Sequence, residues 1–267
     1  MRKIINKQLE NYKSKDVGLL FSGGMDSLSL LLSCLDIGIR PNLYTFRLKS
    51  YYSEDYLKSV HISRIFNLNL NVTIIDDEDI ERLIKDIKYI IKEFKVKKKT
   101  QIQCIHPFLH MVNNVSNENI LSGLCADDLY GSSRKMQELG RLNQNEFDNK
   151  RRDLFLNPES SSFKYIKYIF ESNNIKFIAP YKDNINLFNY FINKSFKELH
   201  SPKQKMVMYE SYKYELEKYD LYRRNSNLQC NSKLREFHDK LLNTKENTNH
   251  NKSVVAIYNR YYKEIWG

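Results

Sequence analysis

The sequence of 267 residues has few glycines, few cysteines and no long apolar run, and each shortage excludes a class of protein. No apolar stretch approaches the roughly 20 residues that a membrane-spanning helix needs. The four cysteines (Cys34, Cys104, Cys125 and Cys230) form no C-x-x-C pair, which argues against a disulfide framework or a Cys-rich zinc site. The basic N-terminus lacks an apolar segment typical of a signal peptide. We therefore expect a cytoplasmic protein with no membrane partner.

What the sequence does contain is a sizeable apolar fraction and an excess of positive charge. Hydrophobic residues make up 41% of the chain, enough for a substantial core. The net charge is +11, from 43 basic and 32 acidic residues, which can attract nucleotides, nucleic acid or other anions. The basic residues are dispersed, however, with one run at 95–99. Nucleic acid is therefore a possible partner that the charge pattern does not favour.

The first half of the chain alternates between strand-like and helix-like segments. Strands are predicted at 17–21, 43–46, 71–75 and 120–121, and helices at 26–37, 53–66, 80–94 and 108–115. This alternation predicts an α/β fold with a doubly wound, mostly parallel sheet. Ligands of such sheets bind at the carboxyl ends of the strands, where two S-G sequences follow predicted strands.

The second half has a different pattern. Residues 132–162 are polar and read as a flexible connection, and helices are predicted beyond it at 163–170, 187–196, 205–219 and 253–266. We interpret the chain as a single domain, 1–267. Residues 1–131 are its nucleotide-binding α/β core, and 163–267 form a helical C-terminal layer that completes it.

The sequence S-G-G-M-D-S at 22–27 separates two apolar runs. Paired glycines at a strand-to-helix turn let backbone N–H groups approach an anion, and the helix dipole favours negative charge there. Asp26 would repel a phosphate unless a cation lies between them, so its presence suggests Mg²⁺. A tight turn with Asp26 as an ordinary helix cap is the simpler alternative.

This loop lacks the lysine of the Walker sequence and the spacing of the dinucleotide-binding fingerprint. It resembles the pyrophosphate loop of the N-type ATP pyrophosphatases, which have the adenine nucleotide alpha hydrolase-like fold. The resemblance implies cleavage of ATP between its α and β phosphates, with formation of an adenylated substrate. It also implies nucleotide-binding residues in the first loop, which are Phe21, Ser22, Gly23, Gly24, Asp26 and Ser27.

A second loop selects a family within that superfamily. The sequence L-S-G-L-C-A-D-D-L-Y-G at 121–131 resembles the L-S-G-x-G-A-D-E-[LI]-F-G-G signature of the asparagine synthetase family, in its synthetase domain. Four of the eight glycines lie in these two loops, which suggests that they serve ligand approach. Weaker similarities occur at 45–48, 179–183, 203–208 and 256–266. They imply that the backbone near Leu48 flanks adenine and that Lys205 contacts the phosphates.

Several residues depart from the family pattern. The sequence starts close to the first loop, so we expect no glutaminase domain and a nitrogen donor that is ammonia, an amine, or ammonia from a separate protein. Leu124 replaces the glutamate that asparagine-forming members place near the reacting carboxylate, Cys125 replaces a glycine, and Ile178 replaces an arginine. These changes bear on the acceptor substrate and leave the ATP-binding residues intact.

The resemblance thus implies an ATP-dependent ligase that adenylates a small-molecule carboxylate, releases pyrophosphate, and forms an amide with release of AMP. Lys205, Asp127 and Asp26 would be catalytic, with Asp26 and Asp127 holding Mg²⁺. Ser122 and Gly123 would join the nucleotide-binding residues. The sequence predicts neither the acceptor acid nor the oligomeric state.

Two other functions fit the same loops. The chain could adenylate a nucleobase in nucleic acid, which its net charge favours slightly although the dispersal of the basic residues does not, or it could bind ATP without turnover. His106 and His110 are four residues apart and could bind a metal, but the sequence offers no third ligand, so ordinary core or surface histidines are the better prediction. Cys125 is better explained as a small residue than as a nucleophile.

Overall fold

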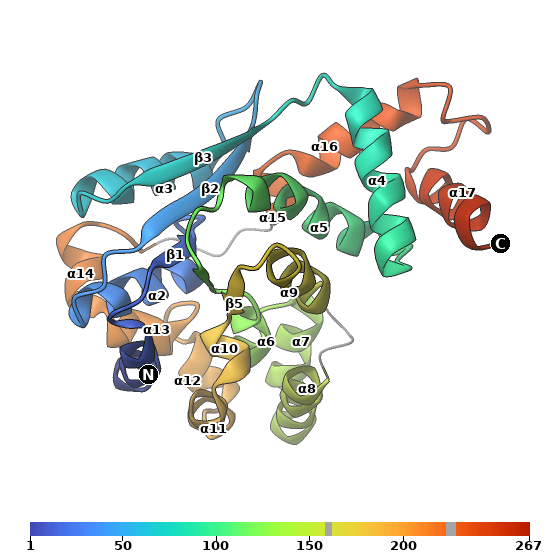
Figure 1. Cartoon of the computed structure of the whole chain (residues 1–267). Coiled ribbons are helices and arrows are strands. Elements are labelled where there is room, and N and C mark those ends of the chain that lie inside the picture. The colour runs from blue at the N-terminus through green and yellow to red at the C-terminus, as the bar shows by residue number, and fades with distance from the viewer. Residues whose placement is uncertain (158–161, 223–227) are drawn as a thin grey trace.

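The computed structural model describes residues 1–157, 162–222 and 228–267, and a parallel sheet forms its centre (Figure 1). Within these residues the sheet has five strands in the order β3-β2-β1-β4-β5. All four neighbouring pairs are parallel. The strands are β1 (Val17–Leu20), β2 (Asn42–Leu48), β3 (Leu70–Ile75), β4 (Asn119–Ser122) and β5 (Lys176–Ile178). The order reverses between β1 and β4, so that a ligand crevice is expected beyond their carboxyl ends.

Alternation of side chains along the central strands builds a core on each face of the sheet. In β1, Leu19 belongs to one apolar cluster and Leu20 to the other. In β4, Leu121 and Ile120 divide in the same way. Because both faces of these strands are covered, the strands read as continuous apolar runs in the sequence. The predicted doubly wound α/β fold is therefore confirmed.

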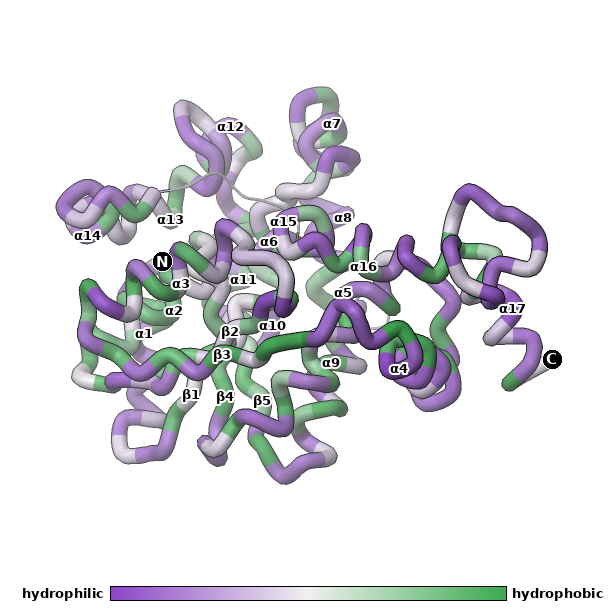
Figure 2. The backbone as a smooth tube through the Cα atoms, turned by 90° about the horizontal axis from the view of Figure 1, so that it is seen from above, coloured by the Kyte–Doolittle hydropathy of each residue, from purple (hydrophilic) through white to green (hydrophobic). Residues whose placement is uncertain are grey.

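The helices divide between the two faces of the sheet. The first face is covered by α1 (Arg2–Leu9), α2 (Met25–Asp36), α3 (Glu54–Ile65), α6 (Ala126–Tyr130), α7 (Arg134–Leu142), α8 (Gln144–Leu156), α10 (Pro180–Asp183), α11 (Ile185–Ile192), α12 (Phe196–His200), α13 (Met206–Ser211) and α14 (Lys213–Lys218). The second face is covered by α4 (Ile80–Phe94), α5 (Lys99–Met111), α9 (Phe163–Glu171), α16 (Leu234–Asp239) and α17 (Val255–Trp266). In the view from above, α1 and α2 lie on one side of the strands and α4 and α17 on the other (Figure 2). Short helices η1 (Glu10–Tyr12), η2 (Val112–Asn114), α15 (Leu228–Asn231) and η4 (Lys240–Asn243) connect these elements.

The interpretation of 132–162 as a flexible connection is wrong for most of its length, because α7 and α8 occupy it. Their polar faces meet solvent, while Met136, Phe147 and Arg151 are buried. The Arg151 guanidinium donates to the carbonyls of Leu129 and Phe191, which ties this segment to its neighbours. Part of the predicted connection, 158–161, lies outside the described residues.

Three further predictions from the second half are corrected. Residues 163–267 are not purely helical, because the short strand β5 extends the sheet next to β4. The helix predicted at 205–219 is two helices, α13 and α14, which meet at Tyr212. Finally, α5 begins at Lys99 inside the basic run and continues through Pro107, earlier than the predicted start at residue 108. Among the described residues, every helix is too short or too polar to cross a bilayer.

Candidate nucleotide-binding site

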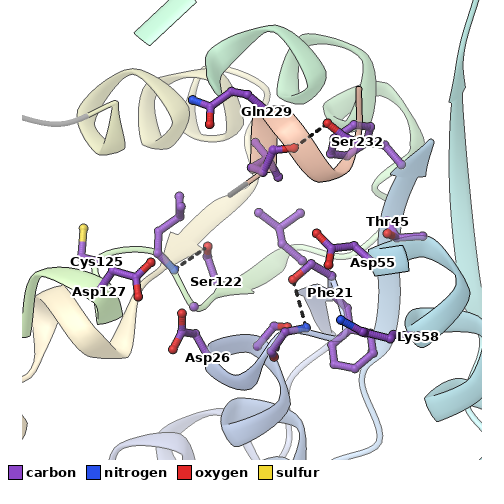
Figure 3. A pocket seen from close by; sticks show the side chains of 18 of the residues that line it. Phe21, Asp26, Thr45, Asp55, Lys58, Ser122, Cys125, Asp127, Gln229 and Ser232 are labelled. Atoms are coloured by element: carbon purple, nitrogen blue, oxygen red, sulfur yellow. Dashed lines mark hydrogen bonds between the residues drawn. The ribbon is translucent and has the colours of Figure 1, made fainter. Parts of the chain in front are cut away.

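The two S-G loops lie side by side because their strands are paired. β1 and β4 are in register, with Leu20 opposite Ser122, so that the two strands end at the same edge of the sheet. The loops also share a local turn. The hydroxyl of Ser22 accepts a hydrogen bond from the N–H of Gly24, at 3.2 Å, and that of Ser122 accepts from the N–H of Leu124, at 3.3 Å (Figure 3). Short side-chain bonds of this kind fix tight turns.

The glycines of the loops allow close packing of backbone on backbone. A Cβ on Gly123 would lie 2.9 Å from the backbone of Asp26 and Ser27, so the second loop rests directly on the start of α2. Gly23 has a positive φ of 68°, and a Cβ there would lie 2.7 Å from Cβ of Lys58 on α3. Their role in loop packing was not anticipated by the sequence, which suggested ligand approach alone. Glycine suits both the close backbone contact at 123 and the positive φ at 23, because it has no Cβ.

One lysine joins the aspartates of the two loops. Nζ of Lys205 lies 2.6 Å and 2.7 Å from the two carboxylate oxygens of Asp26, and 2.8 Å from Oδ1 of Asp127. Lys205 precedes α13 with a positive φ of 57°, an unusual conformation for a residue with a long side chain. Three residues that are far apart in the sequence therefore form one charged cluster, which we call the carboxylate–lysine cluster.

Burial and charge shift the pKa values of this cluster. The Lys205 side chain is 1% exposed, and the Asp26 side chain 19%. Burial raises the pKa of Asp26 to about 6, although the ammonium of Lys205 opposes this shift. Burial alone would lower the pKa of Lys205, but the two carboxylates outweigh it and raise the pKa. The Asp127 side chain is 52% exposed and is the open member of the cluster.

A cavity of about 750 Å³ extends from the two loops across the carboxyl end of the sheet. Among the residues with predicted roles, Phe21, Ser22, Gly24, Asp26, Ser27, Ser122, Gly123 and Asp127 line it. A cavity of this size and mixed polarity suits a nucleotide together with a second small molecule.

Three of the predicted residues lie behind the wall of this cavity. Lys205 and Gly23 do not line it, because Asp26 and Asp127 cover the lysine and α3 covers the glycine. Leu48 is buried in the core of the second face. The preceding residues of β2, Thr45 and Phe46, line the cavity in its place.

The cavity also has lining residues that sequence reasoning missed. Asp55 and Lys58 lie on α3, and Figure 3 shows both beside the cavity. Burial raises the pKa of Asp55 to about 6. Because α3 follows β2 and starts at the carboxyl end of the sheet, the strand order alone could have placed these residues near the site. Phe108 on α5 and Gln229 on α15 also line the cavity, and their sequence context gives no comparable signal.

Leu124 and Cys125 are two positions at which the second loop departs from its family, and these departures affect the local backbone and the wall of the cavity. Cys125 has a positive φ of 68°, where the family signature has glycine. Burial raises the pKa of its thiol, which makes a reactive thiolate unfavourable. Leu124 and Cys125 line the cavity, as do Arg134 and Gln137 on α7, so that its walls include both apolar and polar groups.

The geometry of the carboxylate–lysine cluster also fits Mg²⁺. Three carboxylate oxygens from Asp26 and Asp127 already converge on one cationic nitrogen, at 2.6 to 2.8 Å. Mg²⁺ prefers oxygen ligands of this kind and commonly uses one or two carboxylates together with phosphate oxygens. Nζ of Lys205 occupies the point where these oxygens converge, so an ion would have to bind the two aspartates from the cavity side, where both line the wall.

Fold and site together define an α/β protein with a cavity at the switch point of a parallel sheet. Residues 2–256 match the asparagine synthase family, and the chain belongs to that family. The chain is 28% identical over 141 residues to a candidate glutamine-hydrolysing asparagine synthetase of Methanocaldococcus jannaschii. This match covers 52% of the chain and 26% of the relative, so the chain aligns with about a quarter of the relative's length.

Among solved structures, the fold is similar to a predicted subunit of a tRNA methyltransferase from the same organism. The TM-score is 0.36 and the identity 17%, with 79% of this chain and 93% of the other covered. A likeness at this level carries no information about function.

Proposed function

We propose that the protein is an ATP-dependent amide-forming ligase. It would adenylate a small-molecule carboxylate with release of pyrophosphate, and then transfer ammonia or an amine to the acyl group with release of AMP. The observation that carries the proposal is the carboxylate–lysine cluster, in which Asp26, Asp127 and Lys205 meet between the two loops. Membership of the asparagine synthase family supports the same chemistry.

The reaction begins with a poor electrophile, because a carboxylate resists attack by an amine. An oxygen of the carboxylate attacks the α-phosphorus of ATP, and the bond to the α,β-bridging oxygen breaks. The enzyme must align the two groups and stabilise the negative charge that develops on pyrophosphate. The amine then attacks the acyl carbon, and AMP leaves with the oxygen that came from the carboxylate.

The first loop would hold the phosphates. The N–H groups at the start of α2 and the positive end of its dipole favour an anion at this position. The hydroxyl of Ser27 donates to the carbonyl of Gly24 at 3.1 Å and can turn toward a ligand. Lys58 adds a positive charge from α3 at the same wall of the cavity.

The carboxylate–lysine cluster would help to balance the negative charge of the ATP phosphates. Asp26 and Asp127 would hold Mg²⁺, a cation whose chemistry is to neutralise phosphate charge. Lys205 keeps the two carboxylates paired from behind the cavity wall, and its positive charge would act on the leaving group across them. Because its ammonium is buried, its interaction with a charge that develops nearby is stronger than it would be in water.

The acceptor would lie at the end of the cavity formed by the second loop and α7. Leu124 and Cys125 make part of this wall apolar, and Arg134 and Gln137 offer groups that can bind a carboxylate or an amide. We infer that the acceptor differs from aspartate, because the glutamate that asparagine-forming relatives place at the position of Leu124 is absent.

The experiment is to incubate the protein with ATP, Mg²⁺ and a panel of carboxylic acids, amines and tRNA. Pyrophosphate and AMP are then measured by coupled assay and chromatography. Release that requires a carboxylate and an amine supports the ligase. Release that requires tRNA would replace it by nucleobase adenylation, and ATP binding without any release would leave a nucleotide-binding protein.

A further inference from the structure

Three helices of the second face carry a second group of polar side chains, which we call the imidazole cluster. It consists of Asp86 on α4, His106 and His110 on α5, and His238 on α16 (Figure 1 shows the helices). Asp86, His106 and His238 are buried, and His110 is partly exposed. None of the four lines the nucleotide cavity. The proposed reaction therefore gives this cluster no role.

The side chains of this cluster converge on one point. Nε2 of His110 lies 2.8 Å from Oδ2 of Asp86, and Nε2 of His106 lies 3.4 Å from the same oxygen. A ligand atom from each of the three residues lies within 4.8 Å of the other two. His106 and His110 are one helical turn apart, so that α5 presents both rings on one face. The sequence showed the two histidines and lacked the third ligand, which α4 supplies.

Neighbouring groups hold these side chains in place. Nε of Arg82 donates to Oδ1 of Asp86 at 2.9 Å, which leaves Oδ2 to face the two imidazoles. Nδ1 of His106 lies 3.1 Å from Nε2 of His238, and Nδ1 of His238 lies 2.6 Å from the hydroxyl of Tyr258 on α17. Metal-binding histidines almost always have such a partner on the second ring nitrogen.

We propose that Asp86, His106 and His110 form a binding site for a divalent cation of the zinc class. The ligand atoms are Nε2 of each histidine and Oδ2 of the aspartate, with water as the remaining ligand. Two imidazoles and one carboxylate suit Zn²⁺, whereas Mg²⁺ prefers oxygen alone. The partial exposure of His110 provides a route for the ion.

Both imidazoles face the same carboxylate oxygen of Asp86. This arrangement favours a bound cation as the reason for the cluster over hydrogen bonding alone. Arg82 already pairs Asp86, so that the buried carboxylate needs little further compensation. A cation would instead use both nitrogens and the oxygen as ligands and would link α4 to α5. Since α5 also lines the nucleotide cavity through Phe108 and Met111, the ion would stabilise one wall of that cavity from outside.

The test uses the full chain without a polyhistidine tag, stripped with a chelator and titrated with Co²⁺. Visible d–d absorption reports a site of low coordination number, because Co²⁺ in an octahedral oxygen site absorbs weakly. We expect one equivalent per chain and displacement by Zn²⁺. His110→Ala should weaken binding by more than about 100-fold, since even partners outside the ligand set contribute 10- to 100-fold.

His61→Ala is the matched control, because His61 is an exposed histidine on α3. It should bind Co²⁺ as the wild type does. His110→Gln provides a second variant if His110→Ala fails to fold, and far-ultraviolet circular dichroism checks both. The proposal is overturned if the wild type shows no saturable Co²⁺ absorption, or if the absorption persists in both folded His110 variants. Either result would leave the cluster as a hydrogen-bonded network.

Discussion

The two S-G loops begin alike and end differently. Each has a serine whose hydroxyl accepts from the N–H two residues later, and each contributes an aspartate to Lys205. In the first loop a glycine takes the positive φ, and the aspartate is mostly buried. In the second loop Cys125 takes the positive φ, and Asp127 is half exposed. The comparison indicates that the first loop forms the more buried side of the site and the second loop the more exposed side.

Removal of Lys205 tests the one contact that both loops share. Lys205→Met should lower ATP-dependent pyrophosphate release by about 10²- to 10³-fold, the usual loss of one electrostatic group that stabilises a transition state. The assay is single-turnover pyrophosphate release, with folding checked by circular dichroism. Lys213→Met, an exposed lysine on α14, is the control and should retain activity. An active Lys205→Met protein would remove the lysine from the mechanism.

Neutralising the open aspartate tests the magnesium assignment. Asp127→Asn should raise the Mg²⁺ concentration needed for half-maximal activity by at least about tenfold, because an amide oxygen is a weaker ligand for a hard cation. Titration of activity with Mg²⁺ at saturating ATP measures this change. Asp153→Asn, on the exposed face of α8, should leave the titration unchanged. The same Mg²⁺ requirement in Asp127→Asn would place the ion elsewhere.

The pH dependence tests both loops at once. Burial raises the pKa of Asp26 in the first loop and of Asp128 in the second to about 6. In the metal-free protein these carboxyl groups take up protons as pH falls through 6, so that protons compete with Mg²⁺ for Asp26. Activity should therefore be constant above neutrality and fall by up to tenfold per unit below pH 6. A profile that stays flat to pH 5 would contradict this assignment.

The raised pKa values also predict how the stability of the protein changes with pH. Both groups bind protons more tightly in the folded protein than in the unfolded chain. Their contribution to folding is therefore present at low pH and is lost as pH rises from about 4 to about 6. Mg²⁺ should offset part of this loss at neutral pH. Chemical denaturation with and without Mg²⁺ measures the difference.

The contact between the loops can be broken by a single methyl group. Gly123→Ala should lower the free energy of unfolding by about 1–3 kcal/mol, because its Cβ would meet backbone that cannot move aside. Gly24→Ala meets the side-chain oxygen of Ser22 instead and should be less destabilising. Denaturant unfolding compares the two, and equal losses would show that the loops are not held in contact.

Cys125 offers the smallest and most specific change. Cys125→Gly restores the residue type of the family signature and relieves a positive φ that a side chain disfavours. We expect the free energy of unfolding to change by about 1 kcal/mol or less, with strain relief partly offset by the greater entropy of glycine in the unfolded chain. A large loss of stability would mean that the thiol makes a packing contribution that its conformation does not indicate.

The sequence was informative where local pattern and chemistry coincide. Apolar strands followed by S-G loops predicted the parallel sheet and the meeting of both loops, because paired parallel strands end at one edge. The helix predicted at 53–66 is α3, and the side chain of Ser53 caps it by accepting from the N–H of Tyr56. Such features depend on residues that are close in sequence.

The rest depends on contacts between distant residues. Helices α7 and α8 have polar surfaces that read as a loop, and their burial of Phe147 follows from packing on α6 and α11. Which residues of β2 reach the cavity could not be predicted either: Thr45 and Phe46 line it, whereas the Leu48 side chain lies in the core of the second face. The contact of Asp86 with two histidines required the packing of α4 on α5.

The most direct test of the proposed chemistry follows an oxygen atom. The acid that best supports pyrophosphate release is labelled with ¹⁸O in its carboxylate, and the AMP formed is examined by mass spectrometry. Attack of that carboxylate on the α-phosphorus predicts one ¹⁸O atom in each AMP. Unlabelled AMP, or products that are ADP and orthophosphate, would contradict the account.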